Sequence, residues 1–279
     1  MIVVSAENEA AGAWSDLLGL DGIVRAKDYH FGGPSDEDGP RSATIELENA
    51  ALSIPIDEGE LGLAADERYL RFEKVFGTVT LTAEGVEADF RGMFHGSECE
   101  VSVRMRGGLD RLTTLEDVDF TVHLSAKDFE LPKYGERAPA SHRRFIDRWV
   151  AIRKFYDRFD PHGRVDIEID AEKRAGPNNP LVVRLVRMTA RDADASYWKF
   201  PYRVSHLTGS VEYSSDGVFL RHLKGRHADG DIEVNGRLST PNRCAEADLT
   251  IKGDRILIDD DLIEPLPLGF RKINESFHP

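Results

Sequence analysis

Hydrophobic and polar residues alternate along most of this chain. Eight short runs place apolar side chains at every second position, with mainly Glu, Asp, Ser, Thr or Lys between them: residues 44–47, 79–82, 99–103, 120–124, 165–169, 211–213, 232–235 and 249–252. Because successive side chains of a strand point to opposite faces, each run predicts a strand with one apolar and one polar face. Turn pairs such as Asp216-Gly217 and Asp229-Gly230 separate the runs and favour tight hairpins. The pattern therefore predicts a mainly β fold built on an antiparallel sheet.

One segment, residues 141–159, has a helical pattern instead. Ser141 can cap its start, and the Asp-Pro-His-Gly sequence at 160–163 ends it and turns the chain into the next strand. The cations on its polar face are either a solvated helix surface or a contact for anionic head groups. Its apolar residues recur at helical spacing: Phe145, Trp149, Ile152, Phe155, Tyr156 and Phe159.

The chain also repeats itself. Segments 76–79, 84–86 and 91–92 recur at 208–211, 216–218 and 224–225, with offsets of 132 or 133 residues. Residues 119–122 recur at 248–251, and 159–161 at 277–279. We therefore divide the chain into residues 1–42, to which we assign no role, a first β repeat at 43–162 ending in a helix, and a second at 163–279 ending in a short helix. Because repeats of this kind stack on their neighbours, we expect the chain to be a fragment of a longer array.

Charge, hydropathy and cysteine content argue against several classes of function. The chain of 279 residues carries 36 Lys and Arg against 50 Asp and Glu, a net charge of −14, which argues against a nucleic-acid partner. No apolar run is long enough for a spanning helix, and residues 1–5 lack the features of a signal peptide. Cys99 and Cys244 are too few for a disulfide framework or a cysteine metal site.

A search for catalytic chemistry finds no motif. The nine histidines, among them His95, His222 and His227, do not occur at metal-ligand spacing. The acidic run 259–261 lacks the frame of a calcium loop, and we interpret it as the charged N-terminus of a helix before Leu262. No serine lies in a nucleophile elbow. We expect a non-enzymatic protein without catalytic residues, metal or cofactor.

Aromatic residues alternate at Trp198, Phe200 and Tyr202, so they would share one face of a strand. Such a row either stacks on sugar rings, as in a carbohydrate-binding module, or packs inward like other aromatic residues of a sheet. Pro201 places this strand at an edge or an end.

The motifs around the second copy resemble a known family. Residues 196–202, 207–213 and 216–218, followed by 223–225, 230–232 and Gly236, are similar to the repeats of AsmA-like and TamB-like bacterial envelope proteins of the bridge-like lipid transfer superfamily. The resemblance covers residues 43–279. It implies an elongated, curled antiparallel sheet, the β-taco, with a hydrophobic groove that holds phospholipid or other acyl lipid. It also implies a place in the periplasm or cell envelope and a role in outer-envelope assembly or intermembrane lipid transport. Members usually carry an N-terminal membrane anchor, for which this sequence has no matching segment.

These observations single out the apolar strand positions as the candidate lipid groove. The predicted lining is Val79, Leu81, Val101, Val103, Phe120, Val122, Leu124, Val211, Tyr213, Ile232, Val234, Leu249 and Ile251. The predicted helix at the groove rim contributes Phe145, Trp149, Ile152 and Phe159.

Alternation alone does not distinguish an open groove from the closed core of a sandwich. Two alternatives therefore stay open: an extracellular β-sandwich array for adhesion or glycan binding, and a hydrolase with a β-solenoid body.

Overall fold

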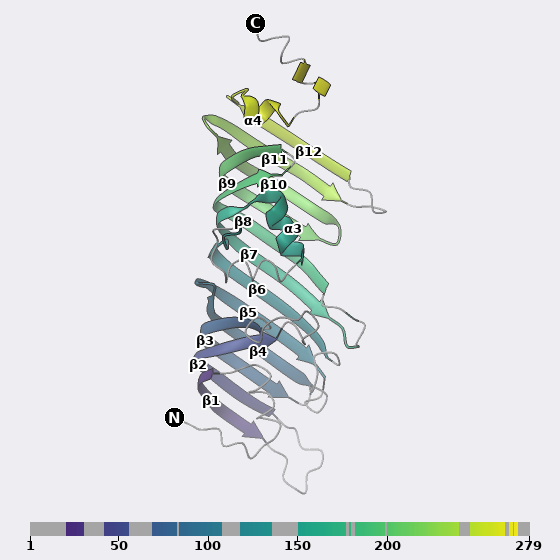
Figure 1. Ribbon diagram of the computed structural model, residues 1–279. Helices are drawn as coiled ribbons and strands as arrows, with labels where there is room; N and C mark the ends of the chain where they lie inside the picture. The colour runs from purple at the N-terminus through teal and green to yellow at the C-terminus, as the bar shows by residue number, and fades with distance from the viewer. Residues whose placement is uncertain are drawn as a thin grey trace. The chain divides into compact units, whose positions relative to one another are not determined.

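The computed structural model describes residues 21–30, 42–55, 69–82, 84–107, 118–135, 150–176, 179, 182–198, 200–239, 246–265, 268–269 and 271–272. The predicted rim residues Phe145 and Trp149, the short helix expected before Phe277, and Cys244 lie outside these ranges. The described strands form one antiparallel sheet in which each strand pairs with the next in sequence, from β1 to β12, so the sheet is not closed (Figure 1). The prediction of a mainly β, antiparallel fold is confirmed.

The described strands contain between 9 and 16 residues each. In order they are β1 (Asp21–His30), β2 (Ser42–Pro55), β3 (Tyr69–Thr82), β4 (Gly85–Phe94), β5 (Ser97–Arg106), β6 (Asp119–Glu130), β7 (His162–Lys173), β8 (Val182–Tyr197), β9 (Phe200–Ser214), β10 (Gly217–His227), β11 (Gly230–Ser239) and β12 (Glu246–Asp254). Every run predicted from alternation lies inside one of them.

Four strands, β1, β4, β8 and β10, have no counterpart among the predicted runs. In β10 the alternation is broken by Phe219, which is adjacent to two apolar residues. The guanidinium groups of Arg221 and Arg237 lie 5.5 and 5.2 Å from the centre of its ring. Cationic cover of this kind allows an aromatic residue to occupy a polar face.

The chain divides into two compact units. Unit 1 comprises residues 1–127 and 168–186, and unit 2 comprises residues 128–167 and 187–279. The division falls within strands β6, β7 and β8. The repeat boundary at residue 162 stays a prediction.

The core of unit 1 lies on the apolar face of β2 to β6. Side chains in β4 and β5 alternate between buried and exposed positions, as the sequence pattern requires. Phe72, Val75, Val101 and Val118 are fully buried. The ring of Phe72 lies 5.6 Å from that of Phe90 and 5.2 Å from that of Phe94, so three phenylalanines pack together here.

In the described part of unit 2, helices α3 and α4 accompany the sheet. Helix α3 spans Val150–Phe159 and ends where Asp160, at a positive φ of 38°, turns the chain into β7. Helix α4 spans Asp260–Ile263, and the Asp259 side chain accepts a hydrogen bond of 3.0 Å from the Leu262 amide. The interpretation of the acidic run as the start of a helix is confirmed.

The hairpins β3–β4 and β9–β10 contain equivalent β-bulges. In β3, two residues, Lys74 and Val75, lie opposite the single residue Gly92, and Lys74 has a φ of 51°. In β9, His206 and Leu207 lie opposite Gly225, and His206 has a φ of 54°. Each bulge increases the local twist of its strand.

Glycine is favoured opposite these bulges because the bulged strand occupies the space beside it. A Cβ atom on Gly92 would lie 3.1 Å from Val75 Cγ2. On Gly225 it would lie 2.5 Å from Val204 Cγ1 and 3.0 Å from Leu207 Cδ2. The backbone of the bulge also receives support from the neighbouring strand, since the His206 amide donates a hydrogen bond of 3.2 Å to the Asp194 carboxylate.

Candidate functional site

The apolar face of unit 1 contains all seven of its predicted groove residues. Antiparallel pairing places directly opposite residues on the same face, and the register aligns these seven in three adjacent rows. The rows are Leu81–Val86–Met105–Phe120, Val79–Ala88–Val103–Val122 and Gly77–Phe90–Val101–Leu124. Val79 and Val101 are buried, and the other five are half-buried.

The apolar face of unit 2 contains the remaining six. Pairing through β9 to β12 aligns Tyr213–Val218–Leu238, Val211–Leu220–Gly236–Leu249, Leu223–Val234–Ile251 and Gly225–Ile232–Gly253. Val211, Ile232 and Val234 are half-buried. Tyr213, Leu249 and Ile251 are exposed, with 67% of Ile251 accessible to solvent.

This surface suits hydrocarbon rather than a charged ligand. None of the rows in either unit contains a charged side chain. Transfer of a methylene group from water to such a surface is favourable by about 0.8 kcal/mol. The structure therefore brings each set of predicted residues together on one face, while their contact with lipid stays a prediction.

The polar face of unit 1 is a ladder of charged pairs that cross the strands. Arg104 of β5 lies 2.8 Å from the Asp89 carboxylate of β4, which also accepts a hydrogen bond of 2.6 Å from the Ser102 hydroxyl. Hydrogen bonds from the Arg104 guanidinium, and then from Ser102, hold the pKa of Asp89 below its ordinary value. Farther along, Arg184 of β8 pairs with Glu172 of β7, and its hydrogen bond lowers the pKa of that carboxyl.

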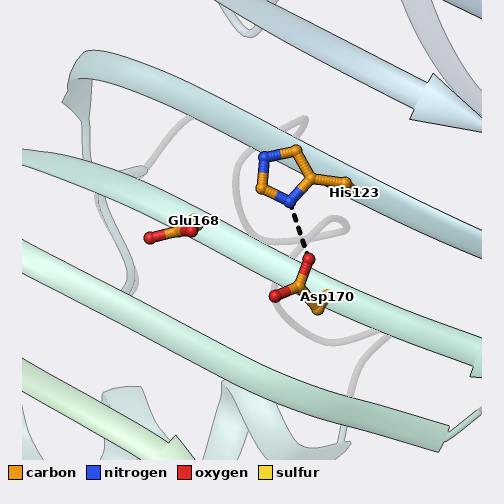
Figure 2. Close-up of side chains that lie close together, drawn as sticks. All are labelled: His123, Glu168 and Asp170. Atoms are coloured by element: carbon orange, nitrogen blue, oxygen red, sulfur yellow. Dashed lines mark hydrogen bonds and ion pairs between the residues drawn. The ribbon is translucent and has the colours of Figure 1, made fainter.

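A histidine and two carboxylates meet on the same face (Figure 2). His123 comes from β6, while Glu168 and Asp170 are two residues apart on β7, and the donor atoms of the three lie within 4.8 Å of one another. His123 Nδ1 lies 2.6 Å from Asp170 Oδ1. The sequence search missed this group because its members are 47 residues apart, and only the pairing of β6 with β7 brings them together.

The side chains of this cluster are of the kinds that bind a divalent cation, since imidazole and carboxylate are both zinc ligands. Two features argue against cation binding here. The His123–Asp170 pair already satisfies its own hydrogen bond, and the hollow around it is also lined by the cations Arg104 and Arg184. The expectation of a chain without a metal site stays a prediction, and this cluster is the place to test it.

Unit 2 has a similar polar ladder. Arg191 pairs with Asp166, Arg164 lies 2.5 Å from Asp128, and Arg187 lies 3.2 Å from Glu212. At the β10–β11 hairpin, Asp231 accepts hydrogen bonds from two arginines, Arg226 and Arg255, and both lower its pKa.

The three aromatic residues at the start of β9 do not form one platform. Tyr202 is buried and stacks on His227 at 3.7 Å, and Phe200 is half-buried. Trp198 lies in the turn before β9 and is 58% exposed. The inward-packing interpretation is therefore correct for Tyr202, and a three-ring sugar platform is not formed.

Helix α3 packs on its own unit through aromatic contacts. Tyr156 is buried, and its ring lies 5.8 Å from that of Tyr134. Of the predicted rim residues, Ile152 and Phe159 are half-buried, and the Phe159 ring lies 5.5 Å from that of Tyr197 in β8. Whether this helix borders a lipid groove stays a prediction.

The other histidines considered from sequence serve local roles. His95 occupies the β4–β5 turn with a φ of 47°, and its ring lies 4.6 Å from that of Phe94. His222 is exposed at a bulge in β10, where its amide donates a hydrogen bond of 2.7 Å to Asn235 Oδ1. His227 Nε2 lies 3.7 Å from Asp259.

Comparisons with other proteins do not connect this chain with a known family or fold. Searches against protein-family models, curated proteins and solved structures give no significant match for this chain. Among the described residues, no helix combines the length and the apolar composition that crossing a membrane requires.

Proposed function

We propose that this chain is a non-enzymatic, AsmA-like lipid-handling protein of the bacterial cell envelope, which holds or conducts acyl chains along the apolar face of its sheet. One observation carries the proposal: on β9 to β12, aliphatic side chains in continuous register remain half-exposed or exposed. An exposed apolar strip of this kind is unfavourable in water and is typical of a surface that a ligand covers.

The bulges support a repeat architecture. Lys74 and His206 are 132 residues apart, the same offset that relates the Gly-containing segments of the sequence. Each has a positive φ, and each precedes an apolar residue that lies opposite a glycine. We infer that β3 to β6 and β9 to β12 are two copies of one four-stranded unit, followed by α3 and α4 respectively. The local twist of the bulges fits a sheet that curls.

The described strands also favour an open face over a sandwich. All twelve strands belong to one sheet, so within the described residues no second sheet faces the apolar rows. The alternative of a β-sandwich array for glycan binding has less support, because Tyr202 is buried and stacks on His227, so it cannot form a sugar-binding row with Trp198.

The experiment is lipid analysis of the purified chain. We expect mass spectrometry of organic extracts to detect phospholipid or fatty acid at a stoichiometric level. Ile251→Glu should reduce the lipid recovered at least severalfold, because a carboxylate opposes acyl contact. Ile251 is exposed, so this change spares the core.

The matched control is Thr250→Glu, which introduces the same charge one position away on the opposite face of β12. This variant should retain its lipid. Equal lipid content in the two variants, or no lipid in the unsubstituted protein, would contradict the proposal.

A further inference from the structure

The C-terminal end of α3 and the β8–β9 turn form one joined surface. The Trp198 amide donates a hydrogen bond of 2.8 Å to the carbonyl of Arg158, and the Phe159 ring lies 5.5 Å from that of Tyr197. These contacts fix the turn to the helix end. The exposed residues of this region, Arg153, Lys154, Arg158, Tyr197 and Trp198, are called the α3 surface below.

The cations of the α3 surface lack the partners that arginines have elsewhere in unit 2. In the ladder, Arg164, Arg187 and Arg191 each pair with a carboxylate. Within the described residues, Arg153, Lys154 and Arg158 form no such pair, and the exposed acidic residue of α3 is Asp157 alone.

The charge of this region is opposite to that of the chain. Helix α3 carries two arginines and one lysine against one aspartate, a net charge of +2 in a protein of net charge −14. A local excess of positive charge in a strongly acidic protein indicates a surface that meets a negatively charged partner.

The aromatic residues of the α3 surface narrow the partner to a lipid bilayer. Trp198 is 58% exposed and Tyr197 is 40% exposed. Tryptophan and tyrosine concentrate at membrane–water interfaces, where the ring contacts acyl chains and the polar group remains hydrated. The buried Tyr156 shows that α3 packs inward through its apolar face, so its cations remain free to contact head groups.

We propose that the α3 surface docks the protein on a bilayer containing anionic phospholipid, with Arg153, Lys154 and Arg158 on the head groups and the rings of Tyr197 and Trp198 at the interface. This goes beyond lipid binding by the apolar face. A protein that takes up acyl lipid needs contact with a bilayer. The α3 surface would make that contact through residues that do not belong to the apolar rows.

The test is flotation with vesicles of phosphatidylcholine mixed with phosphatidylglycerol, compared with vesicles of phosphatidylcholine alone. We expect binding to the mixed vesicles only, and a loss of binding as salt rises. The triple variant Arg153→Glu/Lys154→Glu/Arg158→Glu should lower the partition coefficient at least about tenfold, because each substitution replaces an attraction to the anionic head groups with a repulsion.

The matched control reverses three exposed cations elsewhere, in Arg106→Glu/Lys127→Glu/Lys252→Glu, and should retain most of the binding. Trp198→Ala should weaken binding and diminish the blue shift of tryptophan fluorescence that vesicles produce. Thermal unfolding of each variant verifies that it is folded.

Three outcomes would overturn the inference: equal losses in the two triple variants, equal binding to the two vesicle types, or displacement of the protein from vesicles by duplex DNA at equal charge concentration, which would assign the surface to nucleic acid. The result is independent of the apolar face. Ile251→Glu should still bind vesicles, and the α3 triple variant should still carry copurified lipid.

Discussion

The apolar faces of the two units differ in exposure although the same alternation produces both. In unit 1 Val79 and Val101 are buried, whereas in unit 2 Ile251 is 67% exposed. Position in the sheet accounts for part of the difference. Val101 lies between Phe90 and Leu124, whereas Ile251 belongs to β12, the last described strand of the sheet, and pairs with Val234 on one side. Period-two alternation thus selects the face of a residue, and the neighbours on either side of it in the row influence how much of it is buried.

The largest difference between the two apolar faces should appear when a glutamate replaces one aliphatic residue on each. Val101→Glu places a charge at a position that is 2% exposed, and we expect the free energy of unfolding to fall by about 3–5 kcal/mol. Ile251→Glu should change it by less than about 1 kcal/mol. Urea denaturation followed by circular dichroism measures both values, and similar losses would remove the distinction between the two faces.

An intermediate effect should come from the buried thiol of unit 1. Burial raises the pKa of Cys99 from 9.0 to about 11. Between these two values the thiol ionises in the unfolded chain but not in the folded one. Keeping the thiol neutral therefore adds fully to the free energy of unfolding below pH 9, and this contribution is lost as the pH rises to about 11. Its magnitude is on the order of 2 kcal/mol.

The measurement is denaturation as a function of pH in a Cys244→Ala background, so that Cys99 is the one remaining thiol. Cys99→Ala in the same background should flatten the slope between pH 9 and pH 11. Rapid modification of Cys99 by a thiol reagent in the native protein would instead show that the face of unit 1 is open.

The smallest effect should be shared by the polar faces. Arg104→Ala in unit 1 and Arg187→Ala in unit 2 each remove one partner of a half-exposed ion pair. We expect each to reduce the free energy of unfolding by less than about 1 kcal/mol, and by less still at high salt. A larger loss in one unit, measured in parallel urea titrations, would show that the two units differ on both faces rather than on the apolar face alone.

The sequence predicted the strand class and the assignment of side chains to faces, because strand pairing places Val101 and Val103, and likewise Ile232 and Val234, in adjacent apolar rows. Phe219 concealed β10, since an aromatic residue on the polar face interrupts the pattern. The group of His123 and Asp170 depends on which strands pair, and local sequence does not encode that. The exposed state of Ile251 was not predictable either, because exposure depends on what covers a strand.

The paired bulges restrict how far one strand can slide along the next without exposing its apolar residues. Before the β3 bulge the buried residue is Phe72, at an even position, and after it the apolar row passes through Val75 and Val79, at odd positions. If β3 kept Lys74 but paired as a regular strand without the bulge, Phe72 and Val75 would point to opposite faces, and one half of the strand would be turned over. A shift of β3 by one residue would instead move the two-residue step away from Gly92, the position whose missing side chain accommodates it. Each bulge and its glycine therefore restrict the hairpin to one register. An array built from such hairpins keeps its apolar residues in register from one strand to the next.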